Sequence, residues 1–276
     1  MKSSYENSIK FDLKRIRIIE RKIKTIQKKS KNQFVIYSAV TNNYDQIFEH
    51  NIIDDIDFII FSEKEIKSNS WNLIKIDFNY RDPRRTAKIF KILPHLFLKS
   101  YNGSLWIDAN LKFKQKLISY INCFIQGTSI ITLFDHPQRQ CIYEEAKECK
   151  FWNKDKIETI NLQIENYKKQ NYPKKNGLIQ GRFILRKHND EKVKVLMKNW
   201  WSEIENNSVR DQLSFNYVCW KINIQYLSVH HSEAKKYFSV NAHRKDISYD
   251  IKQKKILNFK IIFMKILNRV YSFLKN

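Results

Sequence analysis

The sequence is poor in glycine and proline, with four of each among 276 residues. It contains neither G-x-G-x-x-G nor G-x-x-x-x-G-K-[ST], so two common glycine-rich phosphate-binding loops are excluded. Any nucleotide binding must therefore use other residues. Cysteine is equally scarce, and no C-x-x-C spacing or zinc-type histidine arrangement accompanies it. We expect reduced, mostly buried thiols in a cytosolic protein. The four residues are Cys123, Cys141, Cys149 and Cys219.

Acidic residues are few, since 28 Asp and Glu face 51 Lys and Arg, giving a net charge of +23. The excess is concentrated at the ends. Residues 1–33 carry eleven basic and three acidic side chains, and residues 251–276 carry seven basic and none acidic. The central 217 residues hold only the remaining +8. We predict a basic N-terminal helix at 1–33, a globular domain at 34–250 and a basic amphipathic helix at 251–276.

Long apolar runs are also missing, because no stretch approaches the ~18 residues that a membrane-spanning helix needs. In 251–276 the apolar side chains share one helical face, with Lys254, Lys265 and Arg269 opposite, as in helices lying in a membrane interface. Packing of this helix on its own domain is the alternative. The apolar stripe is Ile256, Phe259, Phe263, Leu267, Val270 and Leu274.

The N-terminal segment also has helical apolar spacing, but charges interrupt every stretch that could serve as a signal-peptide core. We expect this helix to pack against the domain, with self-association into an oligomer as the alternative. Its apolar positions are Ile9, Leu13, Ile16, Ile19, Ile23 and Ile26.

Between the ends, short apolar runs alternate with helical patterns, which predicts an α/β fold whose sheet is covered by helices on both faces. Expected strands are 34–40, 57–62, 71–76, 104–107, 129–134, 182–186 and 224–228. Expected helices are 81–98 with a kink at Pro94, 117–125, 141–149, 154–170 and 193–204, with another opening at 210–211. In such folds ligands bind at the carboxyl ends of the strands.

Several candidate functional residues lie at these strand ends or at helix starts. Asp108 and Asn110 directly follow a buried strand and could bind one hard cation, although Asp-x-Asn also occurs in ordinary turns. Arg84 and Lys88 lie at a helix N-terminus, where a diphosphate could bind, but a solvated helix face has the same pattern. Asp211 could be a helix N-cap or an acid facing a reacting centre.

Seven segments, in this order, resemble one known family: the glycosyltransferase-like domain of plant pectin and mucilage proteins (TOD/MUCI type) and of many bacterial polysaccharide loci. The resemblance covers roughly residues 34–230, and its order is more specific than any single motif. The segments are YSAVTNNYDQ, DFIIFSE, DPRRTAKIFKILPH, SLWIDAN, FDHPQRQCIYEEA, GLIQGRFILRKHN and RDQLSFNYV.

This resemblance implies a Rossmann-like GT-A fold, a nucleotide-sugar donor, most simply a UDP-sugar, and a Mn²⁺ or Mg²⁺ ion. The metal ligands would be Asp108, Asn110 and a histidine late in the chain. His243 is the preferred candidate for this histidine, and His230 and His231 are the alternatives. Thr41 and Asp45 would contact the nucleoside, and Arg84, Lys88 and Asp108 the rest of the donor. His136, Arg139 and Glu144 would line the acceptor or donor-sugar side. Asp211 and Gln212 would lie near the reacting carbon, with Asp211 acting as base or as stabiliser of an oxocarbenium-like centre.

The sequence thus predicts a metal-assisted glycosyltransferase acting on a saccharide or lipid-linked acceptor in bacterial capsule or lipopolysaccharide synthesis. We expect a cytoplasmic protein, peripheral at the inner face of the bacterial plasma membrane, held there through 251–276. Two alternatives remain. The resemblance implies a metal-binding element of the Asp-x-Asp type, in which Asn110 stands at the second acidic position. This difference is compatible with a catalytically degenerate protein that acts as a scaffold. The net positive charge suggests a second alternative, a nucleic-acid-binding protein. Most aromatic residues, however, lie inside apolar runs rather than among Lys and Arg, which argues against nucleic acid as a partner.

Overall fold

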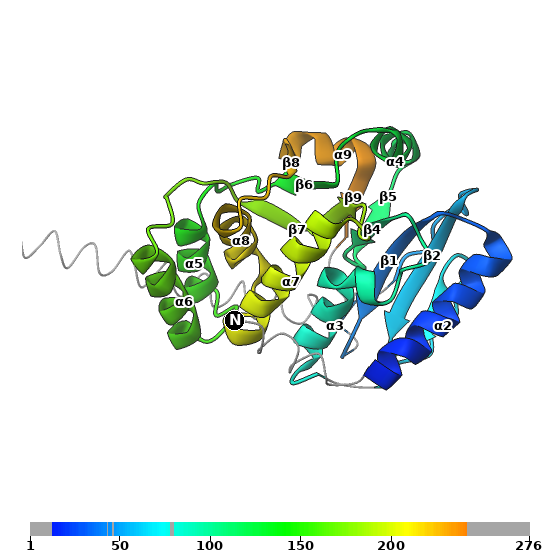
Figure 1. Cartoon of the computed structure of the whole chain (residues 1–276), viewed down its shortest axis with the longest axis horizontal. Helices are drawn as coiled ribbons and strands as arrows, with labels where there is room; N and C mark the ends of the chain where they lie inside the picture. Colours follow the sequence, from blue (N-terminus) through cyan, green and yellow to red (C-terminus); the bar gives the residue numbers. More distant parts are fainter. Residues whose placement is uncertain (1–12, 43, 46, 78–79, 242–276) are drawn as a thin grey trace, which may run out of the picture.

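The computed structural model describes residues 13–42, 44–45, 47–77 and 80–241. The predicted helix 251–276, the end of the predicted 34–250 domain and His243 lie outside these residues. The described part is a seven-stranded mixed sheet flanked by helices, as predicted for a Rossmann-like α/β fold (Figure 1). In spatial order its strands are β3 (Asn72–Lys75), β2 (Ile56–Ser62), β1 (Phe34–Val40), β4 (Gly103–Ile107), β7 (Ile179–Arg186), β6 (Ile131–Asp135) and β8 (Leu227–Val229).

Strand β7 reverses the direction of an otherwise parallel sheet. β3, β2, β1 and β4 pair in parallel, β7 runs antiparallel to both β4 and β6, and β8 is parallel to β6. The register between β6 and β7 shifts between Leu133 and Phe134. This irregularity lets Ile179 and Gln180 pair with the end of β6, so β7 begins three residues earlier than the predicted 182.

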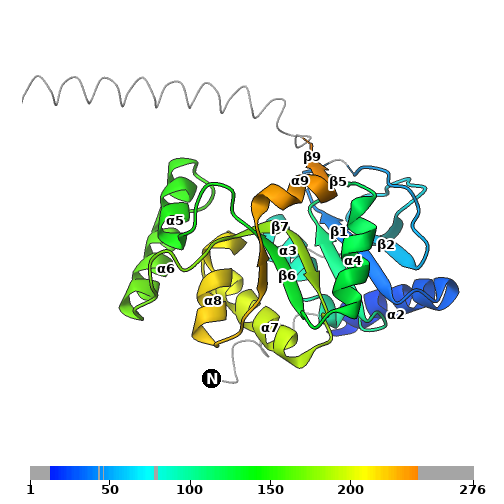
Figure 2. The same cartoon turned by 90° about the horizontal axis from the view of Figure 1, so that it is seen from above.

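Helices cover both faces of the sheet around two apolar clusters (Figure 2). One face carries α2 (Leu13–Ser30), α3 (Pro83–Ile92), α7 (Glu191–Asn206) and α8 (Phe215–Lys221). The other carries α4 (Lys116–Gln126) and the short α9 (Ala234–Tyr237). The pair α5 (Ile142–Phe151) and α6 (Ile157–Lys169) lies at the opposite end of the long axis from α2 in both views.

The N-terminal helix packs on the domain, the first of the two alternatives considered for it. Ile19 and Ile23 are buried in the apolar cluster that α2 shares with α3. Ser30, the last residue of the helix, donates through Oγ to Asp57 Oδ2 at 2.7 Å, and Asn32 Nδ2 just beyond it donates to Asp57 Oδ1 at 2.8 Å. The segment is therefore part of the fold that carries the sheet.

Proline divides the predicted helix 81–98 in two. α3 starts at Pro83, after the N-cap Asp82, whose Oδ1 accepts from Arg85 N at 2.9 Å, and it ends at Ile92. A 3-10 helix, η1 (Pro94–Leu96), follows. Pro94 lacks an N–H and disfavours helical geometry at the preceding residue, so the helix breaks there rather than kinks.

Two short strands were not predicted from the sequence pattern. β5 (Leu111–Phe113) follows the Asp108 turn and pairs antiparallel with β9 (Phe238–Val240) in a separate two-stranded sheet. The 3-10 helices η2 (Asp211–Leu213) and η3 (His231–Glu233) complete the order of elements. Among the residues described, no helix combines the length and the apolar character needed to cross a membrane.

Candidate active site

Polar side chains gather where β4 and β6 end and β7 begins. Asp108 follows β4, and its backbone N–H donates to Arg182 O on β7 at 2.9 Å. His136 follows β6, and its backbone N–H donates to Leu178 O at 2.7 Å. Both strand ends are thus fixed to the start of β7 at one edge of the sheet, the edge at which ligands bind in open α/β folds.

Two lysines and two aspartates form an ion cluster at this edge. Lys91 Nζ lies 2.6 Å from Asp211 Oδ2 and 3.6 Å from Asp108 Oδ1. Lys88 Nζ lies 2.9 Å from Asp211 Oδ2. Trp106 Nε1 donates to Asp108 Oδ1 at 2.9 Å. Three residues singled out from the sequence, Lys88, Asp108 and Asp211, are therefore brought together, with Lys91 as the link between the two aspartates.

Local structure explains how these side chains reach one point. Lys88 and Lys91 are three residues apart on α3 and so share a helix face. Asp211 opens η2, and its carbonyl accepts from Trp200 Nε1 on α7 at 3.1 Å. Ser208, three residues before Asp211, donates through Oγ to Asp155 Oδ2 at 2.7 Å. This hydrogen bond fixes the segment before Asp211 to the connection between α5 and α6.

Gly181 on β7 makes room for the cluster. A Cβ at this position would lie 2.8 Å from Asp211 Oδ2 and 3.1 Å from Lys91 Nζ, closer than carbon atoms normally approach such groups. Any side chain at position 181 would displace the carboxylate or the ammonium group. Glycine at this position therefore leaves both charged groups where they are.

The charges of the cluster shift one another's pKa values. Burial lowers the pKa of Lys88 to about 8, although the neighbouring Asp211 opposes this shift. Burial alone would raise the pKa of Asp211, but Lys88, Lys91 and Arg210 together hold it well below its usual range. Asp211 is therefore ionised throughout the neutral range and is a weak proton acceptor.

A second cluster surrounds Glu145 on α5. Its Oε2 lies 2.7 Å from Arg139 Nε and 4.0 Å from His136 Nε2, and its Oε1 lies 3.8 Å from Arg210 Nη2. Cys149 Sγ donates to Glu145 Oε1 at 3.5 Å. Arg210 links the two clusters, because it neighbours Asp211 in the chain and its Nη2 donates to Gln212 Oε1 at 2.8 Å.

His136 is held as a neutral ring in this setting. Its Nδ1 accepts from the backbone N–H groups of Gln138 and Arg139, at 3.3 and 3.2 Å. Burial lowers the pKa of His136, Glu145 opposes that shift, and Arg139 and Arg182 add to it. The remaining ring proton is then on Nε2, which lies 3.4 Å from Arg139 Nη2 and 4.0 Å from Glu145 Oε2.

Asp108 and Asn110 present oxygen ligands suited to a hard divalent cation. The Asp108 side chain is 35% exposed. Asn110 is buried, and its Nδ2 donates to Asn241 O at 2.9 Å, which leaves the amide oxygen as its remaining acceptor. Asn241 N in turn donates to Asn110 O at 2.9 Å. A carboxylate and an amide oxygen fit Mg²⁺ or Mn²⁺.

Comparison with known proteins shows the family of the chain. The family described as TOD1/MUCI70, glycosyltransferase-like domain, matches residues 24–247. The chain belongs to this family. It is similar to the Probable hexosyltransferase MUCI70 of Arabidopsis thaliana, with 25% identity over 188 residues. The matched part is 61% of this chain and 31% of the relative, so the chain spans about a third of that protein's length.

The other residues singled out from the sequence are dispersed around this TOD1/MUCI70 domain edge. Thr41, at the end of β1, donates through Oγ1 to Pro83 O at 2.7 Å, and Asp45 lies in the following loop. Arg84 Nη2 donates to Lys154 O at 2.9 Å, so it contacts the α5–α6 connection. Glu144 is exposed on α5, whereas its neighbour Glu145 is buried.

Sequence analysis did not single out four residues of this candidate site: Lys91, Glu145, Gly181 and Arg182. Lys91 could have been found, since it lies one helical turn after Lys88. Glu145 could not be separated from Glu144 without the phase of α5. Gly181 and Arg182 depend on the irregular pairing of β6 with β7, which no local pattern encodes.

Proposed function

We propose that this TOD1/MUCI70 domain is a glycosyltransferase that moves a hexosyl or related sugar from a nucleotide-sugar donor to an acceptor hydroxyl. The observation that carries the proposal is the ion cluster of Lys88, Lys91, Asp108 and Asp211 at the ligand-binding edge of a Rossmann-like sheet. Family membership supports the same reaction class.

Cations at this edge would bind the donor diphosphate. Lys91 lies beside Asp108, and Arg182 is close enough to influence the pKa of His136. In the described part of the chain the Arg182 guanidinium has no carboxylate partner, so its charge is available to a ligand. Fixed cations of this kind favour departure of a nucleoside diphosphate, because they act on the charge that develops on it. Lys88 pairs with the Asp211 carboxylate beside them. A UDP-sugar is the simplest donor.

We propose that Asp108 and Asn110 hold Mn²⁺ or Mg²⁺, with His243 as a third ligand. A bound divalent cation would neutralise part of the diphosphate charge. The hydrogen bonds between Asn110 and Asn241 support this choice of histidine, because His243 follows Asn241 by only two residues. Mutation of His243 should weaken Mn²⁺ binding as much as mutation of Asn110.

Asp211 would stabilise positive charge on the reacting sugar rather than act as the general base. Its depressed pKa makes it a poor proton acceptor but a permanent negative charge. Gln212 is fixed beside it, because its Nε2 donates to Ile179 O at 3.3 Å. On the other side, Glu145, Arg139 and His136 would contact the acceptor or the sugar.

The reaction can be tested by measuring nucleoside diphosphate release from a panel of nucleotide sugars, with Mn²⁺ and with EDTA. The donor should also raise the melting temperature of the protein, since a ligand of the native state stabilises it. We expect Asp211→Asn to lower turnover about 100-fold or more while donor binding persists. Full activity in Asp211→Asn, or donor binding with no turnover in the wild type, would contradict the proposal and favour a non-catalytic scaffold.

We propose further that the acceptor is a saccharide or lipid-linked glycan of a bacterial surface polysaccharide, such as capsule or lipopolysaccharide, and that the domain works at the inner face of the plasma membrane. The outward face of α2 supports the membrane part, because it is basic and carries one exposed apolar side chain, Ile18. The predicted helix 251–276 would add a second basic surface. The exposed cations of α2 are Lys14, Arg17, Arg21, Lys22, Lys24, Lys28 and Lys29.

A further inference from the structure

Asp135, His230 and His231 converge outside the ion cluster. Asp135 is the last residue of β6, and the two histidines directly follow β8. β6 and β8 are parallel, with Phe134 opposite Val229, so the next residues of both strands emerge side by side. One ligand atom from each of the three side chains lies within 4.8 Å of the other two.

Existing contacts hold this group in place. Asp135 Oδ1 accepts from His231 N at 2.5 Å and lies 3.4 Å from His231 Nδ1. Gln180 Nε2 donates to Asp135 O at 2.9 Å. The Nδ1 atom of His230 lies 2.7 Å from Ser232 Oγ, which orients that ring. Hydrogen bonds of this kind to ligating residues are typical of metal centres.

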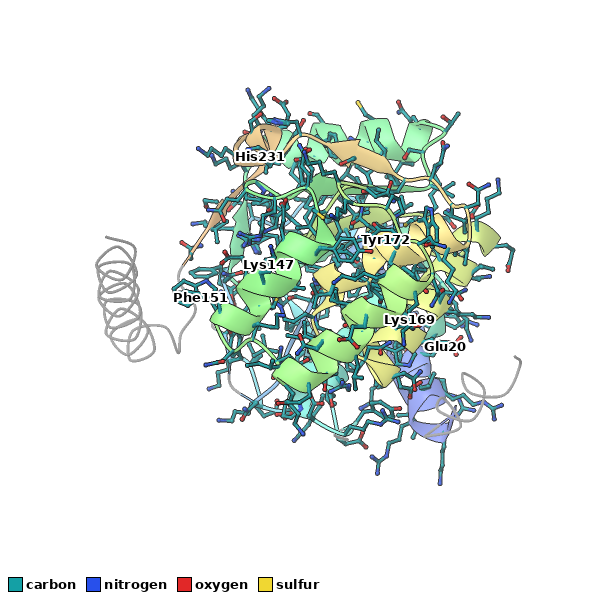
Figure 3. The ribbon with its side chains drawn as sticks, turned by 90° about the vertical axis from the view of Figure 1, so that its left-hand side faces the viewer. Glu20, Lys147, Phe151, Lys169, Tyr172 and His231 are labelled. Atoms are coloured by element: carbon teal, nitrogen blue, oxygen red, sulfur yellow. The ribbon has the colours of Figure 1, made fainter. Side chains whose placement is uncertain are left out.

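The chemistry of the group suits a borderline metal ion. Two imidazoles and one carboxylate are the ligand set of many three-residue zinc sites, which leave a further position for water or substrate. The side chains of Asp135 and His231 are 29% and 33% exposed, so an ion can enter from solvent. Figure 3 shows His231 in the segment after β8, at the molecular surface.

We propose that Asp135, His230 and His231 bind a divalent cation of the zinc type, distinct from the site at Asp108. Two strand spacings separate β4 from β6, because β7 lies between them, which amounts to about 10 Å. One ion could not be shared over that distance. The cation links the end of β6 to η3, α9 and β9, the segment that leads to Asn241 and its contact with Asn110.

The test uses the full chain, freed of metal with EDTA and titrated with Co²⁺, whose visible absorption reports tetrahedral nitrogen and oxygen ligation. Zn²⁺ is then added to displace the Co²⁺. We expect one Zn²⁺-displaceable Co²⁺ per chain at this site, and at least tenfold weaker binding in His231→Ala and in Asp135→Asn. Ser228→Ala, an exposed substitution on β8, is the matched control and should bind as the wild type does.

Asp108→Asn separates this inference from the proposed function, since it removes the other cation site and should leave the Zn²⁺-displaceable absorption unchanged. Melting temperatures without metal show whether each variant is folded. Zn²⁺ should raise the melting temperature of the wild type and of Asp108→Asn, but not that of His231→Ala. Unchanged Co²⁺ affinity in both His231→Ala and Asp135→Asn, or loss of the signal in Asp108→Asn, would overturn the assignment.

Discussion

At the scale of single residues, the fit between Gly181 and the ion cluster is tight. The Asp211 carboxylate pairs with two ammonium groups from α3, and β7 comes close to it at Gly181, a residue without a side chain. The carboxylate has little freedom to move away from the lysines. Its permanent charge and its fixed position therefore come from the same packing.

Gly181→Ala should disturb this arrangement. The added methyl group would overlap Asp211 Oδ2 and crowd Lys91 Nζ, so we expect a loss of about 1–3 kcal/mol in the free energy of unfolding. Turnover should fall at least tenfold, because the charged groups must shift. Urea denaturation and a donor-cleavage assay measure the two effects, and a stable, fully active variant would contradict the tight fit.

Glu145 and Glu144 form a matched pair of neighbouring acids. Glu145→Gln weakens the pairing with Arg139 and Arg210 in a buried setting, so we expect a loss of about 1–3 kcal/mol in stability together with reduced activity. Glu144→Gln changes an exposed side chain and should alter stability by less than about 0.5 kcal/mol. Thermal denaturation and steady-state assays compare them, and the reverse order of effects would restore Glu144 as the functional acid.

His50 makes folding stability depend on pH. Burial, assisted by Lys112 and opposed by Glu49, lowers its pKa to about 4. Between pH 6.5 and 4 the unfolded chain binds a proton that the folded chain excludes, so acidification favours unfolding. His50→Phe should preserve the stacking on Phe113, whose ring lies 4.0 Å away between centroids.

We therefore expect His50→Phe to lose about 1–2 kcal/mol less stability than the wild type between pH 7 and pH 5. Denaturant titrations at the two pH values measure the difference. Burial also lowers the pKa of His188 to about 4, so the variant should keep part of the acid sensitivity. Equal losses in the two proteins would contradict the assignment to His50.

The sequence shows which residue types lie at strand ends and helix starts, and each of Asp108, Lys88 and Asp211 is a candidate for that reason. Side chains that belong to the same clusters through tertiary contacts are not recognised in this way. Glu145 is buried by the rotation of α5 about its axis, and Arg182 is positioned by an irregular strand pair. Such positions depend on contacts between distant segments, which one sequence does not contain.

At the scale of elements, α2 is an integral part of the fold. Ile23→Ala should cost about 2–4 kcal/mol of unfolding free energy, because it removes buried methyl groups from the shared apolar cluster. Ile18→Ala is the matched control on the same helix, since Ile18 is 41% exposed, and should cost well under 1 kcal/mol. Denaturant titration distinguishes them, and equal effects would mean that α2 does not pack as described.

The elements predicted best were those with strong periodicity. β1 coincides with the expected 34–40, and α4 and α7 extend the expected helices by one or two residues at each end. β5 and β9, three residues each, were missed because so short a run has no recognisable period, and they exist through pairing with each other. The end of α3 at Ile92 was not predicted, because Pro94 was expected to kink the helix and instead ends it.

At the scale of the whole molecule, the position of the positive charge matters more than its total. We expect the protein to bind vesicles containing phosphatidylserine or phosphatidylglycerol and to be released by salt, because each basic residue near an anionic surface contributes about 1 kcal/mol that salt screens. Deletion of residues 251–276 should weaken co-sedimentation of the protein with these vesicles. The deletion combined with Arg17→Glu and Arg21→Glu should abolish co-sedimentation while donor binding persists.

Neutral phosphatidylcholine vesicles are the control for this binding. A second control is double-stranded DNA at the same total negative charge as the anionic vesicles. Binding to neutral vesicles as strong as to anionic ones would show that charge is not responsible. Tighter, steeply salt-dependent binding to DNA would instead favour nucleic acid as the partner.

The antiparallel strand β7 has a consequence for how the chain folds. It fills the middle of the sheet, yet it follows β6 in the chain by more than forty residues that contain α5 and α6. Until residues 179–186 leave the ribosome, one edge of β4 and both edges of β6 are unpaired, because β8 comes still later in the chain. Unpaired edges are sites for mispairing. Strand β6 can join the sheet only after β7 has been made, so we expect slow folding limited by this long-range pairing.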